Sequence, residues 1–178
     1  AEIASIRDSL AREKGGWRDL FSAALVAPLA LGILLAVLQQ VTGINVFLYF
    51  GATIFKSLGS SAGVDAGMLQ QIVIGAANAL FTLIAIAVVD RWGRRPLMFV
   101  GAAGMGLSLI VMGVAAQSGT AESMWMLLFI LSYIACFALS VGPVTWVILS
   151  EIYPTAVRGR ALGLATFCLW MADFAVTF

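Results

Sequence analysis

The chain has 178 residues, of which 62% are hydrophobic and 11% are charged, and its formal net charge is +1. Soluble domains carry about 45–50% apolar and about 25% charged residues, so this composition indicates a protein of the lipid bilayer. The low net charge argues against a nucleic-acid-binding surface, and the lack of histidine removes the commonest metal ligand and general base.

The N-terminal residues 1–19 are rich in charge and predict a short surface helix that ends near Gly15-Gly16 and serves as a linker. The chain begins without an initiator Met and stops within an apolar run. We therefore expect a fragment, or a short relative, of a longer protein.

Apolar runs dominate the rest of the chain, residues 20–178, and predict an all-α polytopic membrane bundle. A membrane-spanning helix needs about 20 mostly apolar residues. Four runs meet this length and a fifth reaches the last residue: 21–50, 69–89, 97–117, 124–150 and 161–178. The connections are short, at 51–68, 90–96, 118–123 and 151–160.

The basic residues outside these runs lie on alternate connections. They precede the first run and follow the second and fourth: Arg7, Arg12, Lys14, Arg18, Arg91, Arg94, Arg95, Arg158 and Arg160. Only Lys56 lies in a connection of the opposite side. The positive-inside rule therefore predicts a multi-pass protein of the cell membrane with the N-terminus, 90–96 and 151–160 in the cytoplasm.

The first and fourth runs are the longest, and small or helix-breaking residues interrupt both. Gly43 lies within a polar insert of the first, and Gly142-Pro143 lies within the fourth. The two runs open successive groups of three helices with opposite directions through the membrane. Interrupted helices at matching places of inverted repeats indicate the binding site of a transporter. The alternative is that Gly and Pro are simply common in membrane helices.

The polar insert carries amides deep inside the first apolar run. On a helix, Gln39, Thr42, Asn45 and Tyr49 form one stripe, because they are three, three and four residues apart. Gln40 falls beside the stripe, and we expect unwinding at Gly43 to bring it in line. Neighbouring helices or a polar ligand must satisfy these amides. Four polar residues on one face favour a cavity for a neutral, polyhydroxylated ligand.

Three other residues are candidates for the same cavity. Asn78 lies mid-span in the second run, where a single asparagine is more often an interhelical hydrogen-bonding group. Trp146 and Trp170 lie too far inside their runs for interface anchors, whereas an indole ring suits stacking on a sugar.

Charged residues cluster in the two connections predicted to be cytoplasmic. Gly93 and Pro96 predict a tight turn between the second and third runs. The charges either set the topology with weak exposed ion pairs or form a network that breaks during a conformational change. The residues concerned are Asp90, Arg91, Arg94, Arg95, Glu151 and Arg158.

Asp173 is the only acid within a predicted span. Acids inside a membrane helix are functional candidates, and a proton-coupling role is our hypothesis for this one. The alternatives are a position near the membrane boundary and pairing with a helix outside this sequence.

Four motifs occur in order: Gln39-Gln40-x-x-Gly43-x-Asn45-x-x-x-Tyr49, Asp90-Arg91-x-Gly93-Arg94-Arg95, Gly142-Pro143-x-x-Trp146 and Glu151-x-x-Pro154-x-x-x-Arg158-Gly159. With them the chain resembles the sugar porter family of the major facilitator superfamily, especially bacterial xylose or hexose symporters. The resemblance places the chain in the C-terminal half of that fold, from the end of the intracellular linker to most of helix eleven.

The resemblance also implies roles for the residues of these motifs. Gln39, Gln40, Asn45 and Asn78 match positions that bind sugar hydroxyls, Tyr49 matches an extracellular gating aromatic, and Trp146 and Trp170 match tryptophans beside the sugar. The charged residues Asp90, Arg91, Arg94, Arg95, Glu151 and Arg158 match the cytoplasmic network of the outward-facing state. Departures are Phe50, Leu169, Ala138 and Asp173, where the family patterns have tyrosine, glutamine, glutamate and asparagine.

The resemblance implies transport of a pentose or hexose by alternating access. The mode implied is proton symport by a longer protein, whose N-terminal half is not part of this sequence. The family's proton-linked acid belongs to a helix outside this sequence. A sugar or polyol uniporter and a non-transporting scaffold or sensor remain alternatives. We expect no cofactor, metal or enzyme activity; Cys136 and Cys168 each stand alone in an apolar run and predict packing residues.

Overall fold

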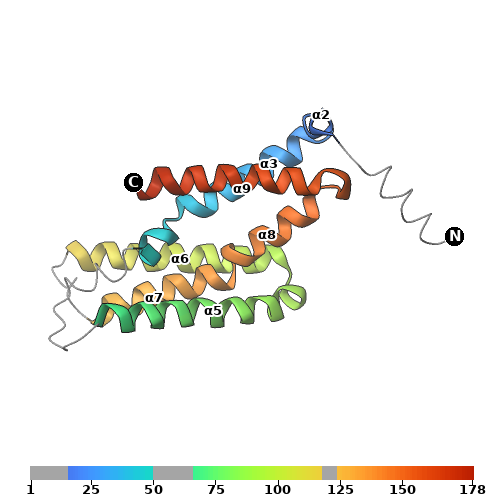
Figure 1. The fold of residues 1–178 in the computed structure, drawn as a ribbon. Coiled ribbons are helices and arrows are strands. Elements are labelled where there is room, and N and C mark those ends of the chain that lie inside the picture. Colours follow the sequence, from blue (N-terminus) through green and yellow to red (C-terminus); the bar gives the residue numbers. More distant parts are fainter. Residues whose placement is uncertain (1–15, 50–65, 118–123) are drawn as a thin grey trace. The chain divides into compact units, whose positions relative to one another are not determined.

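The computed structural model describes residues 16–49, 66–117 and 124–178, and the regular elements in these ranges are all helices (Figure 1). They are α2 (Trp17–Leu20), α3 (Val26–Val41), a further helical segment over 44–49, α5 (Ala66–Trp92), α6 (Arg94–Gln117), α7 (Met124–Leu139), α8 (Val141–Ile152) and α9 (Thr155–Thr177). The predicted surface helix, which ends near Gly15-Gly16, falls on residues outside the described ranges, and α2 begins after it.

Five stretches of the described chain are long and apolar enough to cross a bilayer. They are Val26–Tyr49, Gln71–Trp92, Arg94–Gln117, Leu128–Ile152 and Thr155–Thr177. Each overlaps one of the five apolar runs of the sequence, so the all-α, five-span prediction is confirmed. The protein is a multi-pass membrane protein.

The helices extend further than the apolar runs at the charged connections. The predicted connection 90–96 reduces to Gly93 between α5 and α6, and the predicted connection 151–160 reduces to Tyr153-Pro154 between α8 and α9. Charged residues end an apolar run, but they do not end a helix that continues beyond the hydrocarbon. Arg158 therefore lies in the first turn of α9 and not in a loop.

The turn at Gly93 has the geometry that its sequence predicts. Gly93 has φ +85°, a left-handed conformation that glycine adopts without steric cost. Its N–H donates to the carbonyl of Val89 at 3.0 Å, which closes the C-terminus of α5.

The described residues divide into two compact units, each with its own core. The first unit contains α2, α3, the part of α8 from Trp146 onward and α9 as far as Val176. One face of α9 is buried at every fourth residue, and it packs with residues of the other helices around Leu149 and Tyr153. The members of this core are Leu20, Leu29, Ala36, Leu149, Tyr153, Val157, Ala161, Ala165 and Leu169.

The second unit runs from Thr42 to Thr145 and contains α5, α6 and α7 side by side, with α7 in contact with both others (Figure 1). Small residues set the α6–α7 distance: a Cβ added at Gly101 would lie 1.5 Å from Oγ of Ser140. Such close backbone approach is how membrane helices gain packing energy. The core consists of Ile44, Ile74, Met105, Ile130, Tyr133, Ile134 and Val141.

Large apolar side chains also cover the outside of the spanning helices. Leu83, Phe99 and Ile110 are 66%, 77% and 65% exposed. Exposure of this kind is unfavourable in water and favourable against lipid tails.

Candidate substrate site

The first span is a broken helix, as its sequence predicts. The helix α3 ends at Val41, Gly43 has φ +77°, and the helical conformation resumes over 44–49. Gly43 enters the left-handed region at no steric cost, whereas a side chain there would be strained. Interrupted spans expose backbone and side-chain polar groups at the depth where transporters bind their substrates.

Both glutamines lie in the last turn of α3, before the break. Gln39 is 5% exposed and Gln40 is 8% exposed. The helix is regular through both residues, and the expected unwinding occurs after them, at Gly43; the alignment of Gln40 with the stripe stays a prediction. The break at Gly43 separates both glutamines from Asn45 and Tyr49, which follow it in the chain.

The residues after the break belong to the second unit. Asn45 is half-buried and Tyr49 is 53% exposed. Asn78, on α5, is also half-buried, and its backbone carbonyl accepts a hydrogen bond from Oγ1 of Thr82 at 2.8 Å. Thus two of the predicted sugar-binding amides, Asn45 and Asn78, are in one unit, and the other two, Gln39 and Gln40, are in the other.

Two residues that the sequence did not indicate hold the segment 44–49. Gln71 of α5 donates from Nε2 to the carbonyl of Leu48 at 2.6 Å. Tyr133 of α7 donates its hydroxyl to the carbonyl of Thr42 at 2.6 Å, and its ring packs against Phe47 with centroids 5.0 Å apart. These partners are more than 20 residues away in the chain, so local spacing contains no signal for them.

The fourth span is also interrupted where predicted. The helix α7 ends at Leu139, Ser140 forms a turn, and α8 begins at Val141. Pro143 explains this position, because its ring clashes with the carbonyl four residues earlier, that of Leu139. The break precedes Trp146, which is 40% exposed.

The remaining predicted residues of the apolar spans are on α9. Trp170 is 55% exposed. Asp173 is 7% exposed and continues the buried face that Val157, Ala161, Ala165 and Leu169 form.

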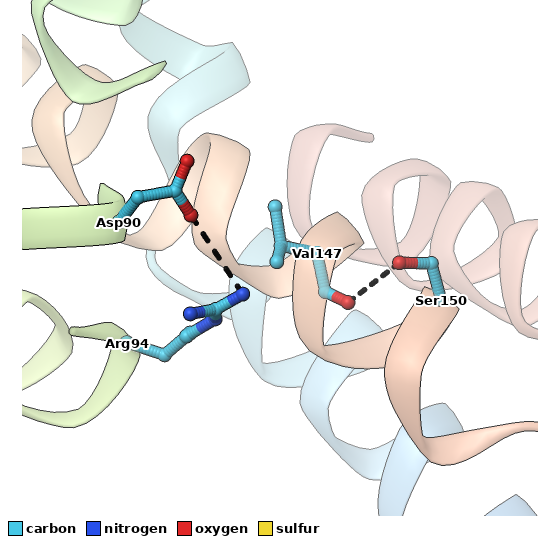
Figure 2. A network of polar contacts seen from close by, with 4 residues as sticks. All are labelled: Asp90, Arg94, Val147 and Ser150. Atoms are coloured by element: carbon cyan, nitrogen blue, oxygen red, sulfur yellow. Dashed lines mark hydrogen bonds and ion pairs between the residues drawn. The ribbon is translucent and has the colours of Figure 1, made fainter. Parts of the chain in front are cut away.

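The candidate gate charges lie at helix ends in both units. In the second, Asp90 and Arg94 form an ion pair of 3.8 Å between side chains that are 79% and 38% exposed (Figure 2). In the first, Nε of Arg158 donates to the carbonyl of Tyr153 at 3.1 Å. Arg91, Arg95 and Glu151 are exposed. The other contact in Figure 2, from Ser150 Oγ to the carbonyl of Val147 at 2.7 Å, lies within α8.

Asp90 and Arg94 lie on either side of the turn at Gly93 and their side chains are partly to largely exposed, so the ion pair contributes about 0.5 kcal/mol to stability. Such a weak pair can break and re-form readily. The geometry therefore allows a conformational role more readily than a structural one.

The chemistry of the candidate substrate residues is that of neutral hydrogen bonding. The four amides supply both donors and acceptors, and the two tryptophans supply apolar ring faces with an N–H donor. This combination suits a ligand with several hydroxyl groups and an apolar face.

Comparison with known proteins identifies the family of the chain. The family model described as "Sugar (and other) transporter" matches residues 1–178. The D-xylose-proton symporter of Escherichia coli (strain K12) is 41% identical over 177 residues, which are 98% of this chain and 35% of that protein. The arabinose-proton symporter of Bacillus subtilis is 39% identical over 176 residues, and the glucose facilitated diffusion protein of Zymomonas mobilis is 42% identical over 147 residues.

Solved structures give the same result. A proton:xylose symporter of the major facilitator superfamily, bound to 6-bromo-6-deoxy-D-glucose, matches with TM-score 0.77 at 41% identity over 84% of this chain and 31% of its own. The inward-open xylose transporter from E. coli matches with TM-score 0.76 at 37% identity over 99% of this chain and 35% of its own. The chain thus spans about a third of the length of these relatives.

Proposed function

The chain belongs to the sugar (and other) transporter family, and we propose that it supplies sugar-binding helices to a membrane transporter for a pentose or hexose. The observation that carries the proposal is the pair of buried amides, Gln39 and Gln40, directly before the helix break at Gly43. An amide in the membrane interior is retained at a cost of several kcal/mol unless it has polar partners. The hydroxyl groups of a sugar can exchange hydrogen bonds with such amides reversibly.

The sugar ligands are Gln39, Gln40, Asn45 and Asn78, with Trp146 and Trp170 against its apolar face and Tyr49 as a gating aromatic. The identities of the relatives support a monosaccharide, because the proteins named above are called xylose, arabinose and glucose transporters. A site of neutral hydrogen-bonding groups discriminates by hydroxyl pattern, because a missing hydroxyl leaves a buried amide unpaired.

Transport proceeds by alternating access. The N-terminal end of the chain and the helix ends near Gly93 and Pro154 face the cytoplasm, an orientation that the distribution of basic residues favours. There the charges of Asp90, Arg91, Arg94, Arg95, Glu151 and Arg158 form ion pairs that hold one state and separate in the other. Exposed pairs such as Asp90–Arg94 are weak enough for this exchange.

Proton symport is the coupling mode that the two proton-symporter relatives favour. Sugar uniport is the second candidate, because a facilitated-diffusion protein is equally similar over most of the chain. Flux of a sugar against its gradient in response to an imposed proton gradient distinguishes the two modes.

Counterflow in proteoliposomes tests the transport function itself. The protein is expressed from its complete coding frame, and vesicles loaded with unlabelled D-xylose, D-glucose, a cyclic polyol or an organic ion are diluted into the labelled solute. We expect exchange of a monosaccharide. Exchange of only the polyol or only the ion would mean that this solute, and not a monosaccharide, is the substrate. No exchange of any solute would favour a scaffold or sensor.

A further inference from the structure

The break in the first span leaves a backbone carbonyl that a continuous helix would satisfy. In an α-helix the N–H of Val46 would donate to the carbonyl of Thr42, four residues earlier. In this structure the N–H of Val46 instead donates to the carbonyl of Gly43 at 3.1 Å. The carbonyl of Thr42 thereby loses the donor that a continuous helix would supply.

Tyr133 takes the place of that missing donor. Its hydroxyl donates to the Thr42 carbonyl at 2.6 Å, a short and direct hydrogen bond between residues 91 positions apart in the chain. Thr42, Val46 and Tyr133 all belong to the second unit. The same carbonyl therefore has two alternative donors: Val46 when the helix is continuous and Tyr133 when it is broken.

The surroundings of Tyr133 keep its hydroxyl in this position. The residue is 0% exposed and lies in the core formed with Ile44, Ile74, Ile130 and Ile134. Its ring is tilted by 52° against that of Phe47, with centroids 5.0 Å apart, so it contacts the segment after the break as well as the carbonyl before it. This close packing restricts the side-chain conformations open to Tyr133.

We propose that Tyr133 is a positioning residue of the sugar site: its hydroxyl holds the first span open at Thr42-Gly43 and thereby fixes the direction of Asn45. The inference rests on the proposed sugar-binding function. Without the hydroxyl, the Thr42 carbonyl recovers its hydrogen bond from the N–H of Val46, and the helix becomes continuous through Gly43. Loss of the break rotates Asn45 away from its sugar-binding position. Tyr133 therefore acts on the site through Asn45 and does not touch the sugar.

The test uses Tyr133→Phe in the protein expressed from its complete coding frame, with D-xylose or D-glucose binding measured by calorimetry. Phenylalanine keeps the ring and removes only the hydroxyl. We expect sugar affinity to fall about tenfold, the effect of losing one buried hydrogen bond. Tyr153→Phe is the matched control, because it removes a buried hydroxyl in the other unit, and it should leave sugar affinity unchanged.

A double-mutant cycle with Asn45→Ala separates positioning from general loosening of the fold. If Tyr133 acts through Asn45, then Tyr133→Phe has little further effect on affinity once Asn45 is alanine. Additive losses in the double mutant would overturn the positioning role. Should Tyr133→Phe not fold, Phe47→Leu, which removes the ring partner of Tyr133, enters the same cycle with the same expected non-additivity.

The outcomes also separate this inference from the proposed function. If the unmodified protein binds no sugar, the proposed function fails. If it binds sugar, and Asn45→Ala weakens binding while Tyr133→Phe does not, only the role of Tyr133 fails.

Discussion

The contact between α6 and α7 predicts a graded response to alanine at three glycines of α6. A Cβ at Gly101 would lie 1.5 Å from Oγ and 2.3 Å from Cβ of Ser140, and 3.0 Å from the backbone carbonyl of Cys136. At Gly104 the nearest atom is Sγ of Cys136 at 2.6 Å, and at Gly106 no atom lies within 4 Å. Carbon atoms in contact are about 3.5–4.0 Å apart, so only Gly101→Ala requires the two helices to separate by about 1 Å.

The expected costs follow this order. Gly101→Ala should lower the free energy of unfolding by about 3 kcal/mol, the upper part of the range for overpacking. Gly104→Ala should cost about 1 kcal/mol, because a cysteine side chain can rotate away. Gly106→Ala should be neutral or stabilising by up to about 1 kcal/mol, because alanine is the better helix former.

Thermal or denaturant unfolding in detergent, followed by circular dichroism, measures the series, with Gly106→Ala as the matched control. Adding Ser140→Gly to Gly101→Ala removes the obstructing side chain and should restore part of the loss. Equal stability of the three alanine variants would refute the close α6–α7 contact on which the expected order depends.

Four further predictions concern the first unit and the charged turn. Gly32→Ala should lower the free energy of unfolding by about 2 kcal/mol, because the new Cβ would lie 1.9 Å from the hydroxyl of the buried Tyr153. Gly163→Ala is the control and should not destabilise the fold, because no atom lies within 4 Å of its new Cβ. Equal melting temperatures of the two variants would contradict this packing. Burial raises the pKa of the Tyr153 hydroxyl from its usual value of 10.0, so the folded state keeps this proton to higher pH than the unfolded state does. The free energy of unfolding should therefore fall as the pH rises above 10. In unfolding curves measured over a pH series, Tyr153→Phe should remove this part of the loss. The same variant should stabilise by about 1 kcal/mol at neutral pH, since the hydroxyl has no hydrogen-bond partner among the described residues. Asp90→Asn should change stability by less than about 0.5 kcal/mol and yet alter the transport rate; a large loss of stability with an unchanged rate would make the Asp90–Arg94 pair structural.

The sequence predicts the local features of this protein because their causes are local. Glycine in a polar insert and proline in an apolar run break helices for steric reasons, and both breaks occur where these residues lie, at Gly43 and before Pro143. The five spans follow in the same way from the length of the apolar runs. Helix ends were less predictable, since charge at 90–96 and 151–160 ends the apolar run but not the helix.

The contacts that hold the candidate site together depend on distant residues. A lone tyrosine in an apolar run such as that around Tyr133 gives no sign that its hydroxyl meets a carbonyl 91 residues earlier. The same holds for the contact of Gly101 with Ser140, and for that of Gln71 with Leu48. The family motifs name the residues proposed to touch the sugar, whereas these supporting contacts require the three-dimensional arrangement.

Sugar binding by glutamine variants tests the central claim most directly. Gln39→Ala and Gln40→Ala each remove one buried amide, and Gln117→Ala removes an exposed amide near the end of α6 as a matched control. In the protein expressed from its complete coding frame, we expect each of the first two changes to weaken monosaccharide binding at least about tenfold, and the third to leave it unchanged. Unchanged affinity in both Gln39→Ala and Gln40→Ala would show that these amides pack helices and do not bind the sugar.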